Sequence, residues 1–306
     1  MRIVFMGTPD FAVPSLECLI SAGHEVCGVF SQPDKPVGRH QNKLQPTPVK
    51  ACALSHGIPV YQPVKLRDGA ALAQLKELAP ELVVVAAYGR ILPDDILALP
   101  PMGCINVHSS LLPKYRGAAP INWAVIHGER ETGVTIMYMA SELDAGDIIA
   151  QEATPIDPEE TVESVHDRLA DLGGRLLVRT VAELAAGTAR RVPQDHSQAT
   201  LAPMLSRELS PIDWSRSGWD IHNQIRGLVP WPATSTDIFS TEPVKVFKST
   251  LLDQRTDKGP GTVVAAGKEG IDVACGDGRV LRILELQAPG SRRMGAGDYL
   301  RGHPIA

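Results

Sequence analysis

Short runs of aliphatic and β-branched residues alternate with helix-like segments through the first third of the chain. This alternation is typical of strands joined by crossover helices, so it predicts a parallel sheet with helices on its faces. The predicted strands are "RIVFM" (2–6), "HEVCGVFS" (24–31), "ELVVVAAY" (81–88) and "CINV" (104–107). The predicted helices run from Pro14 to just before Gly23, from Pro48 to His56 and from Asp68 to Leu78.

The middle of the chain predicts two more strands and a long helix. The segments "GVTIMYM" (133–139) and "DIIAQEATPI" (147–156) are strand-like and are joined by a loop, so we expect them to be neighbours. Thr161 is the expected cap of the long helix. The apolar residues after it recur at steps of three and four, which places them on one helical face: Val162, Val165, Leu169, Leu172 and Leu176.

The pattern changes after Gly187. The segment "GTARRVPQDHSQATLAP" is polar and has no apolar period, so we interpret residues 189–203 as a linker. Beyond it, a short helix (217–228) is followed by closely spaced strands such as "VKVFK", "TVVAA" and "RVLRILELQ", which favour a small β-barrel. The sequence therefore predicts an α/β protein with a Rossmann-like parallel-sheet domain (1–188) and an OB-like β-barrel domain (204–306).

Composition narrows the class of protein. The 306 residues suffice for two domains, and 43% hydrophobic with 21% charged residues is a globular mixture. Without a leader or a membrane span in the sequence, we expect a cytoplasmic protein. The five cysteines form no C-x-x-C pair, so we expect reduced thiols and no metal site. The net charge of -5 argues against wholesale coating of nucleic acid, so any such contact must be local.

Asn106 and His108 occupy the end of the last predicted parallel strand. A single histidine there is most simply a satisfied polar residue. However, ligands of open parallel sheets bind beyond the carboxyl ends of the strands, and residues two apart in a strand point to the same side. An amide donor and an imidazole converging on one group suit acyl transfer, in which one holds negative charge and the other moves a proton.

Asp144, in "SELDAGDI", is the candidate for a third group that orients or charges the imidazole. The alternative interpretation is a simple turn, for which Asp-Ala-Gly is well suited. Asp147 is a competing carboxylate in the same segment.

The stretch "NVHSSLLPKYRGAAPINWAVIHGE", followed by "TGVTIMYMASELDAGDII", resembles the 10-formyltetrahydrofolate-dependent formyltransferases. These share Asn-x-His, then Ser-Leu-Leu-Pro-x-Tyr-x-Gly, then Leu-Asp-x-Gly. The resemblance implies a catalytic triad of Asn106, His108 and Asp144, and it favours Asp144 over Asp147. It also implies folate contacts from Ser110, Leu111, Leu112 and Pro113, with 10-formyltetrahydrofolate as a co-substrate and no permanently bound cofactor.

The triad fixes the chemistry but not the formyl acceptor, which in this family can also be glycinamide ribonucleotide or an amino-sugar nucleotide. Segments across the whole chain resemble the branch that formylates initiator methionyl-tRNA. They include "MGTPDFAVPSLECL", "SQPDKPVGRHQNKLQPTPVK", "VPWPAT" and "RRMGAGDYLRG". Transfer to an amino-sugar nucleotide is the alternative. We expect a monomer that uses the tRNA and the folate.

A basic segment gives independent support for an RNA substrate. Residues 31–50 carry Lys35, Arg39, Lys43 and Lys50 against Asp34 alone, a local net charge of +3. We interpret the segment as a long loop without secondary structure, and the resemblance implies that it meets the acceptor end of the tRNA. From residue 203 onward, 13 Lys and Arg stand against 12 Asp and Glu, which suits contact with backbone phosphates.

Two other classes of protein are alternatives. A dinucleotide-dependent dehydrogenase requires G-x-G-x-x-G after the first strand, whereas only Gly7 is present. If the chain were a non-catalytic RNA-binding protein, the match of Asn106, His108 and Asp144 to the family's motif would be a coincidence.

Overall fold

A computed structural model describes residues 1–37 and 43–305. The chain divides into two compact units. The first unit comprises Met1–Gly117, Thr132–Thr154 and His166–Leu201, and the second comprises Ala118–Glu131, Pro155–Val165 and Ala202–Ala306. Each unit therefore combines segments that are distant in the sequence.

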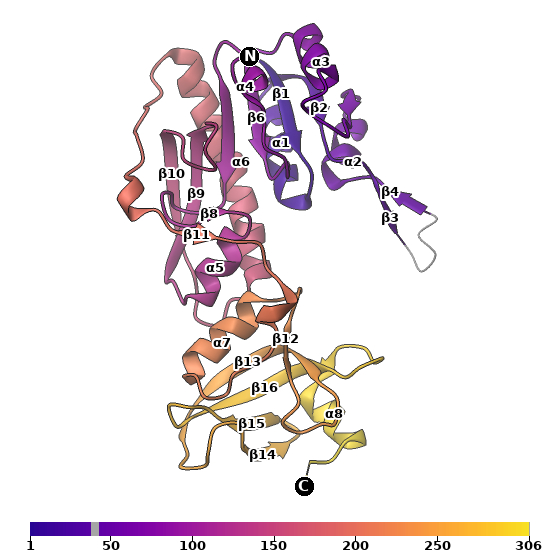
Figure 1. Cartoon of the computed structure of the whole chain (residues 1–306), viewed down its shortest axis with the longest axis vertical. Coiled ribbons are helices and arrows are strands. Elements are labelled where there is room, and N and C mark those ends of the chain that lie inside the picture. The colour runs from indigo at the N-terminus through magenta and orange to yellow at the C-terminus, as the bar shows by residue number, and fades with distance from the viewer. Residues whose placement is uncertain (38–42, 306) are drawn as a thin grey trace. The chain divides into compact units, whose positions relative to one another are not determined.

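A seven-stranded sheet forms the centre of the first unit (Figure 1). Its order is β10-β9-β7-β6-β1-β2-β5. The run from β5 to β7 is parallel, and β9 is antiparallel to β7. The strands are β1 (Arg2–Gly7), β2 (Glu25–Phe30), β5 (Val60–Tyr61), β6 (Leu82–Ala86), β7 (Cys104–His108), β9 (Glu131–Tyr138) and β10 (Ile148–Pro155). The predicted α/β sheet is confirmed, including the adjacency of β9 and β10.

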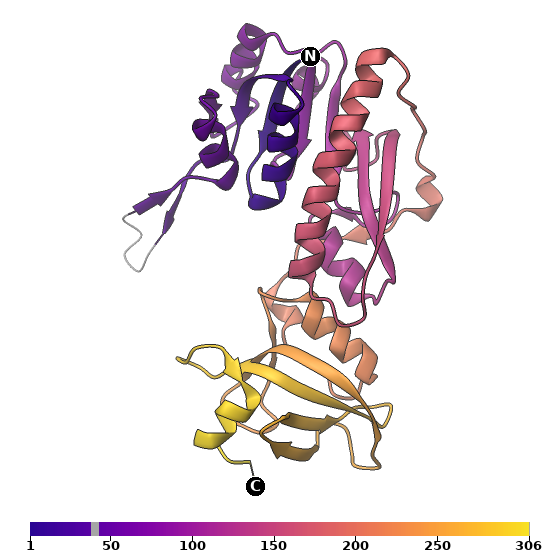
Figure 2. The same cartoon turned by 180° about the vertical axis from the view of Figure 1, so that it is seen from behind.

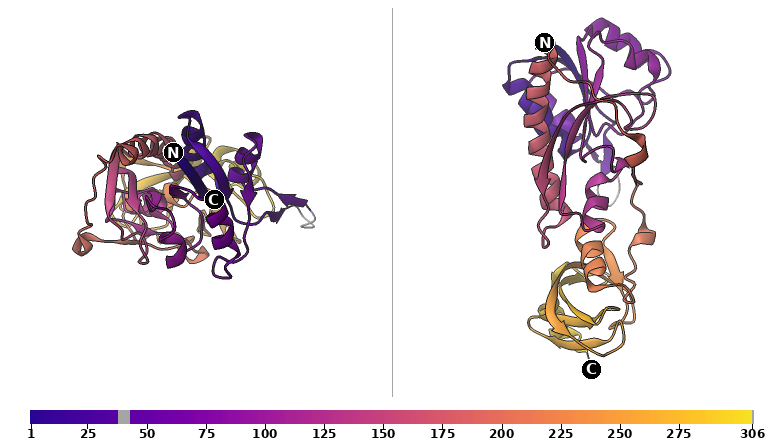
Figure 3. Two further views of the ribbon diagram at one scale, coloured as in Figure 1. Left: turned by 90° about the horizontal axis from the view of Figure 1, so that it is seen from above. Right: turned by 90° about the vertical axis from the view of Figure 1, so that its left-hand side faces the viewer.

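Helices cover both faces of this sheet. They are α1 (Val13–Ser21), preceded by the 3₁₀ helix η1 (Asp10–Ala12), α2 (Pro48–Ser55), α3 (Ala70–Leu78), α4 (Asp94–Leu97) and α6 (Val162–Ala186). Leu75 of α3 and Ile96 of α4 pack in one buried cluster with alternate residues of β1 and β6. The view in Figure 2 shows α6 along the sheet, and the right panel of Figure 3 shows α3 on the opposite side.

Two adjacent glycines bring α6 close to its neighbours. A Cβ on Gly173 would lie 2.9 Å from a methyl carbon of Val107, and one on Gly174 would lie 2.9 Å from the Pro14 carbonyl oxygen. Glycine thus permits a close approach that any side chain would block. This packing supports β7 from behind, directly beside Asn106 and His108.

The sheet also has the topology that creates a binding crevice. From β1 the chain continues to β2 on one side, whereas β6 pairs with β1 on the other. Ligands of open α/β sheets bind where the strand order reverses, beyond the carboxyl ends of the strands. The loops that follow β1, β6 and β7 lie at that edge.

Residues 31–50 are not a loop without secondary structure, and that prediction is wrong. Lys35–Val37 (β3) and Lys43–Gln45 (β4) pair antiparallel as a hairpin near α2 (Figure 1). Each strand is too short to show an apolar period, and Pro36 suggests a loop although proline is tolerated on edge strands. Helix α2 then begins under the cap of Thr47, whose hydroxyl accepts from the Lys50 N–H.

The predicted linker is bound to the first unit over residues 188–201, here termed the strap. Val192 exchanges backbone hydrogen bonds with Ile148, and the Arg116 N–H donates to the Thr200 carbonyl at 2.8 Å. The short strand β11 (Leu201–Ala202) pairs with β8 (Arg116–Gly117), and the 3₁₀ helix η2 (His196–Gln198) lies between these contacts. Because backbone hydrogen bonds hold the strap, it can be fixed to the first unit without an apolar period.

The second unit is an antiparallel β domain, which confirms the predicted class. Its sheet has the order β12-β13-β16-β15-β14, and β17 pairs with β16. The core joins Ile221 and Ile225 of α7 to Val246, Ile271 and Leu281 of the sheet. The elements are α5 (Pro120–Ile126), η3 (Arg207–Leu209), α7 (Gly218–Gly227), β12 (Thr234–Thr236), β13 (Val244–Arg255), β14 (Val263–Gly267), β15 (Gly270–Ala274), β16 (Arg279–Gln287), β17 (Met294–Gly295) and α8 (Ala296–Gly302).

Helix α5 belongs to this second unit although it precedes β9 in the sequence. It packs on α7, where the Asn122 side-chain amide donates to the Gly227 carbonyl at 2.8 Å. In the part of the chain that the structure describes, no helix is long and apolar enough to cross a membrane.

Candidate active site

Asn106 and His108 end strand β7, as the sequence predicts. Asn106 lies opposite Met137 and His108 opposite Thr135 on β9. His108 is 5% exposed, whereas Asn106 is partly open to solvent. Among the described residues, the Asn106 side chain has no hydrogen-bond partner, so its amide N–H groups are available to a ligand.

Two oxygens flank the His108 ring. Nε2 donates to the Tyr115 carbonyl at 2.9 Å, and Nδ1 lies 3.7 Å from Asp144 Oδ2. The first contact fixes the ring orientation and assigns a proton to Nε2. The second distance is longer than a hydrogen bond but within ion-pair range, so a proton on Nδ1 would face the carboxylate.

Asp144 sits on the tight loop between β9 and β10. Its backbone is left-handed, with φ of 50°, and its Oδ2 accepts the Gly117 N–H at 2.8 Å. A Cβ on Gly146 would lie 1.8 Å from the Tyr138 carbonyl oxygen, so the turn requires glycine there. Asp144 can therefore be part of a turn and also face His108, because the turn directs its carboxylate toward the ring.

Asp147 has a different partner. Its carboxylate accepts from Arg191 Nε at 2.7 Å, and this hydrogen bond raises the pKa of the Arg191 guanidinium. Of the two carboxylates compared in the sequence, the structure places Asp144 beside His108.

Residues 110–113 continue from β7 and are held internally. The Ser110 hydroxyl donates to the Lys114 carbonyl at 2.7 Å, and the Leu112 N–H donates to Thr135 Oγ1 at 3.1 Å. Ser110 and Leu112 are buried, whereas Leu111 and Pro113 are partly exposed. The Ser110 hydroxyl is thus occupied by the protein, and the accessible side chains are those of Leu111 and Pro113.

Thr135 and Gln151 support this segment and were not found from the sequence. The Thr135 hydroxyl donates to the Ser110 carbonyl at 2.7 Å, and the Gln151 amide donates to the Leu112 carbonyl at 2.8 Å. Thr135 is fully buried within an otherwise apolar run. A hydroxyl placed between Val134 and Ile136 is the signal that could have identified it, because buried polar groups need partners.

The loops after β1, β2 and β6 are also joined. Thr8 Oγ1 and the Gln32 amide both donate to the Tyr88 carbonyl, at 3.0 Å and 3.2 Å. Gly7 is the one glycine of the dinucleotide-binding motif that the sequence contains. Close packing explains this glycine, since a Cβ there would lie 2.9 Å from the Ala12 Cβ.

The predicted tRNA-binding residues have different environments. Lys35 is exposed on β3, and Lys43 lies on β4. Arg39 lies outside the described residues. Lys50 Nζ donates to Asp34 Oδ2 at 2.6 Å and to Gln62 Oε1 at 2.8 Å, and hydrogen bonds from Lys50 and Gln62 hold the pKa of Asp34 below its usual value. The charge of Lys50 is therefore already engaged.

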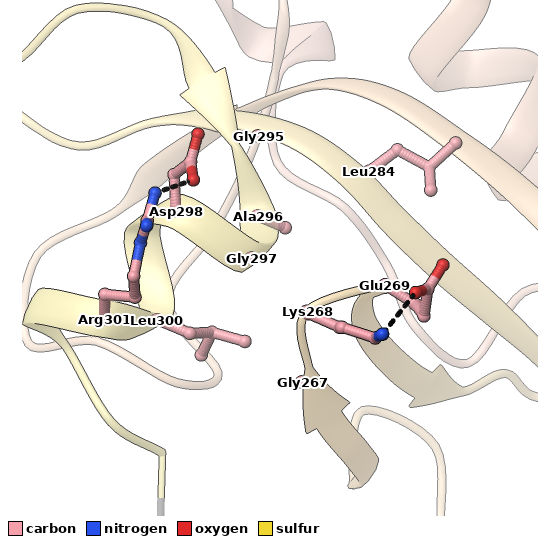
Figure 4. A pocket seen from close by; sticks show the side chains of 10 residues that line it. All are labelled: Gly267, Lys268, Glu269, Leu284, Gly295, Ala296, Gly297, Asp298, Leu300 and Arg301. Carbon is pink, nitrogen blue, oxygen red and sulfur yellow. Dashed lines mark hydrogen bonds and ion pairs between the residues drawn. The ribbon is translucent and has the colours of Figure 1, made fainter.

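Other polar clusters lie outside this site. Among the described residues, Glu17, Cys52 and His56 offer possible metal-ligand atoms within 4.8 Å of one another. A hollow of about 460 Å³ in the second unit is lined by residues of β14, β16 and α8 and by the turn after β14 (Figure 4). Its charges pair locally, Lys268 with Glu269 and Arg301 with Asp298. Neither cluster contains a residue of the predicted triad.

Two family models match the chain. The family model described as formyl transferase matches residues 1–181, and the model of the formyl transferase C-terminal domain matches residues 204–304. The chain belongs to the formyltransferase family. Among the relatives of this formyltransferase, the methionyl-tRNA formyltransferase of Alkaliphilus oremlandii is 50% identical, covering 100% of this chain and 97% of that protein. The one from Pelotomaculum thermopropionicum is 52% identical, covering 100% and 96%.

Solved structures extend the likeness at low identity. An N-formyltransferase from Helicobacter canadensis, in complex with folinic acid and dTDP-3-aminofucose, is 20% identical with a TM-score of 0.68, covering 92% of this chain and 98% of that one. HypX from Aquifex aeolicus, in complex with tetrahydrofolic acid, is 17% identical with a TM-score of 0.65, covering 98% and 47%. At these identities the likeness shows the fold.

Proposed function

We infer that this formyltransferase moves the formyl group of 10-formyltetrahydrofolate to the α-amine of initiator methionyl-tRNA, giving formylmethionyl-tRNA and tetrahydrofolate. The observation that carries this conclusion is the 50–52% identity to methionyl-tRNA formyltransferases over the whole chain. The geometry around His108 supports it, because the Asp144 carboxylate lies 3.7 Å from the imidazole and Asn106 lies two residues earlier on the same strand.

The proposed reaction is amine attack on the formyl carbon. The new N–C bond gives a tetrahedral oxyanion, whose collapse breaks the bond from carbon to N10 of the folate. An α-amine with a reference pKa of about 7.7–8.0 is partly unprotonated near neutrality, so a strong base is unnecessary. The proton lost by the amine must reach N10.

Asn106 is the proposed oxyanion donor, because its side-chain amide has no partner among the described residues. His108 either donates to the same oxyanion or carries the proton to N10, and in either role one of its ring nitrogens must exchange its protein oxygen for the substrate. Asp144 is the proposed group that orients the ring. For the folate, we propose contacts from the segment Ser110, Leu111, Leu112 and Pro113. Burial of Ser110 and Leu112 favours Leu111, Pro113 and the backbone as the contacting groups.

For the tRNA, we propose contacts from Lys35 and Lys43 of the hairpin, from Arg39, which lies outside the described residues, and from the β domain at 204–306. Lys50 serves mainly to fix the base of the hairpin through Asp34. We further propose a catalytic domain over residues 1–188 and a connection over 189–203. A cytoplasmic monomer without a metal ion completes the proposal, and its free cysteines suit a reducing compartment.

The alternative acceptor, an amino-sugar nucleotide, has one observation in its favour. The Helicobacter canadensis enzyme matches 92% of this chain, so the presence of a β domain does not by itself indicate tRNA. Identity separates the two possibilities, at 50% for the methionyl-tRNA enzyme against 20% for this one.

The deciding assay supplies purified protein and 10-formyltetrahydrofolate with either methionyl-tRNA or a dTDP-amino sugar. Formyl transfer to methionyl-tRNA alone is expected. Transfer to the sugar with none to the tRNA would replace this proposal by the alternative, and transfer to neither would contradict both.

A further inference from the structure

One buried glutamine of the strap joins two parts of the active-site region. The Gln194 side chain is 6% exposed, and its amide nitrogen donates to the carbonyls of Asp144 and Gly146, both at 2.8 Å. Its amide oxygen accepts from Arg116 NH2 at 2.7 Å and from Arg116 Nε at 3.2 Å. Both ends of the amide are therefore used.

Arg116 is unusual because it is charged and only 5% exposed. Its carboxylate neighbour, Glu142, lies 3.8 Å away and is itself 73% exposed, so this ion pair is weak. The remaining acceptors of Arg116 are neutral, namely Gln194 Oε1 and His196 Nδ1 at 3.1 Å. Both acceptors belong to the strap, so the strap satisfies a buried charge in β8.

These bonds converge on the backbone of the residue that faces His108. Asp144 has a left-handed backbone, which is unfavourable for a residue other than glycine. Its carbonyl is held by Gln194, and its carboxylate is held by the N–H of Gly117, the neighbour of Arg116. One connected network thus fixes both the position and the direction of Asp144.

We propose that Gln194 is a positioning residue for formyl transfer: it holds the Asp144 loop against β8, so that the strap completes the active site. Its chemistry is specific, because two carbonyls need a donor while Arg116 needs an acceptor. A neutral primary amide provides both on one planar group, whereas a glutamate at this place could serve only the arginine. This inference rests on the proposed function for its kinetic test but not for its spectroscopic one.

The central variant is Gln194→Glu, which keeps the size of the side chain and the contact with Arg116 while removing both donors to the loop. The matched control is Gln198→Glu, the same change at an exposed position of the same strap. We expect Gln194→Glu to lower kcat about 10²-fold, the scale of a 1 Å misplacement, with KM for either substrate changed less than about threefold. The control should behave as wild type.

A double-mutant cycle with Asp144→Asn separates positioning from general damage. If Gln194 acts through the Asp144 carboxylate, adding Gln194→Glu to Asp144→Asn should lower kcat by less than about threefold more. Equal losses in both backgrounds would overturn the proposal, as would a wild-type kcat for Gln194→Glu.

An NMR measurement of the His108 ring does not depend on the identity of the acceptor. Gln194→Glu should shift the His108 ring signals in the direction produced by Asp144→Asn, and Gln198→Glu should leave them unchanged. Unchanged signals in Gln194→Glu would contradict the inference even if the acceptor proved to be a sugar. If that variant does not fold, Gln194→Met, which is similar in length and makes none of these bonds, is measured in the same way.

Discussion

Replacing Gly146 by alanine is the sharpest test of how the turn directs Asp144. The added Cβ would lie 1.8 Å from the Tyr138 carbonyl oxygen, and this distance must open to at least 3.0 Å, a shift of about 1.2 Å. The atom it meets is backbone, so no side-chain rotation can relieve the contact. The shift must be taken up by β9 or by the loop that carries Asp144.

The expected effect of Gly146→Ala follows from that shift. Misplacing a catalytic group by about 1 Å costs roughly 10²-fold in rate, so kcat should fall by about that factor. Overpacking costs typically about 1–3 kcal/mol of stability, which corresponds to a fall in Tm on the order of 5 °C. Folded protein with greatly reduced activity is therefore expected.

The assay combines steady-state formyl transfer with thermal unfolding followed by circular dichroism. Gly267→Ala is the matched control, because a Cβ there meets nothing within 4 Å. A Gly146→Ala variant with wild-type kcat would refute the link between turn geometry and Asp144. A fall in Tm without a fall in kcat would show that the shift is absorbed away from the Asp144 carboxylate.

Three further predictions address the oxyanion donor, the basic hairpin and a buried histidine. Asn106→Ala should lower kcat about 10²- to 10³-fold, the scale of one oxyanion donor, and near-normal turnover would remove Asn106 from that role. Lys35→Ala should weaken tRNA binding and reduce the slope of log K against log salt concentration by about one, as binding titrations at several salt concentrations would show. Lys50→Ala should mainly lower Tm, as thermal melts would show. Burial lowers the pKa of His222 below 6.5, so the unfolded chain binds this proton more readily than the folded chain does. The free energy of unfolding should therefore fall as pH drops below about 6.5. Urea titrations should find a shallower fall in His222→Gln.

The fold could be predicted well where the determining forces are local. Strand β16 spans the residues of the predicted "RVLRILELQ", because its apolar residues recur along the strand and Gly and Asp turns bound it. Helix α7 begins after Ser217, whose hydroxyl accepts the Asp220 N–H as an ordinary cap. Such patterns need no knowledge of distant residues.

The parts missed were those determined by long-range polar contacts. Gln194 is 50 residues from Asp144 in the sequence, although the two residues share a hydrogen bond. No pattern in the polar strap distinguishes Gln194 from the other polar residues around it. The pairing of Lys50 with Asp34 could not be predicted from the sequence either, because a count of charges treats every lysine as free to bind a phosphate. Composition located the basic segment, but only the structure distinguishes an engaged lysine from an exposed one.

We expect catalysis and acceptor recognition to depend on separable parts of the chain. The predicted triad lies on β7 and on the loop between β9 and β10. The Helicobacter canadensis N-formyltransferase, solved with dTDP-3-aminofucose, shares this fold, so the fold alone cannot select tRNA. Acceptor choice must then depend on features outside the triad, and the hairpin is the strongest described candidate because Lys35 is exposed there while Lys50 is paired. Changes at Asn106 should consequently slow transfer to any amine, including a minimal aminoacyl ester, whereas changes at Lys35 should affect only acceptors that carry the tRNA backbone. A minimal ester that responds equally to both changes would show that the two functions are not separate.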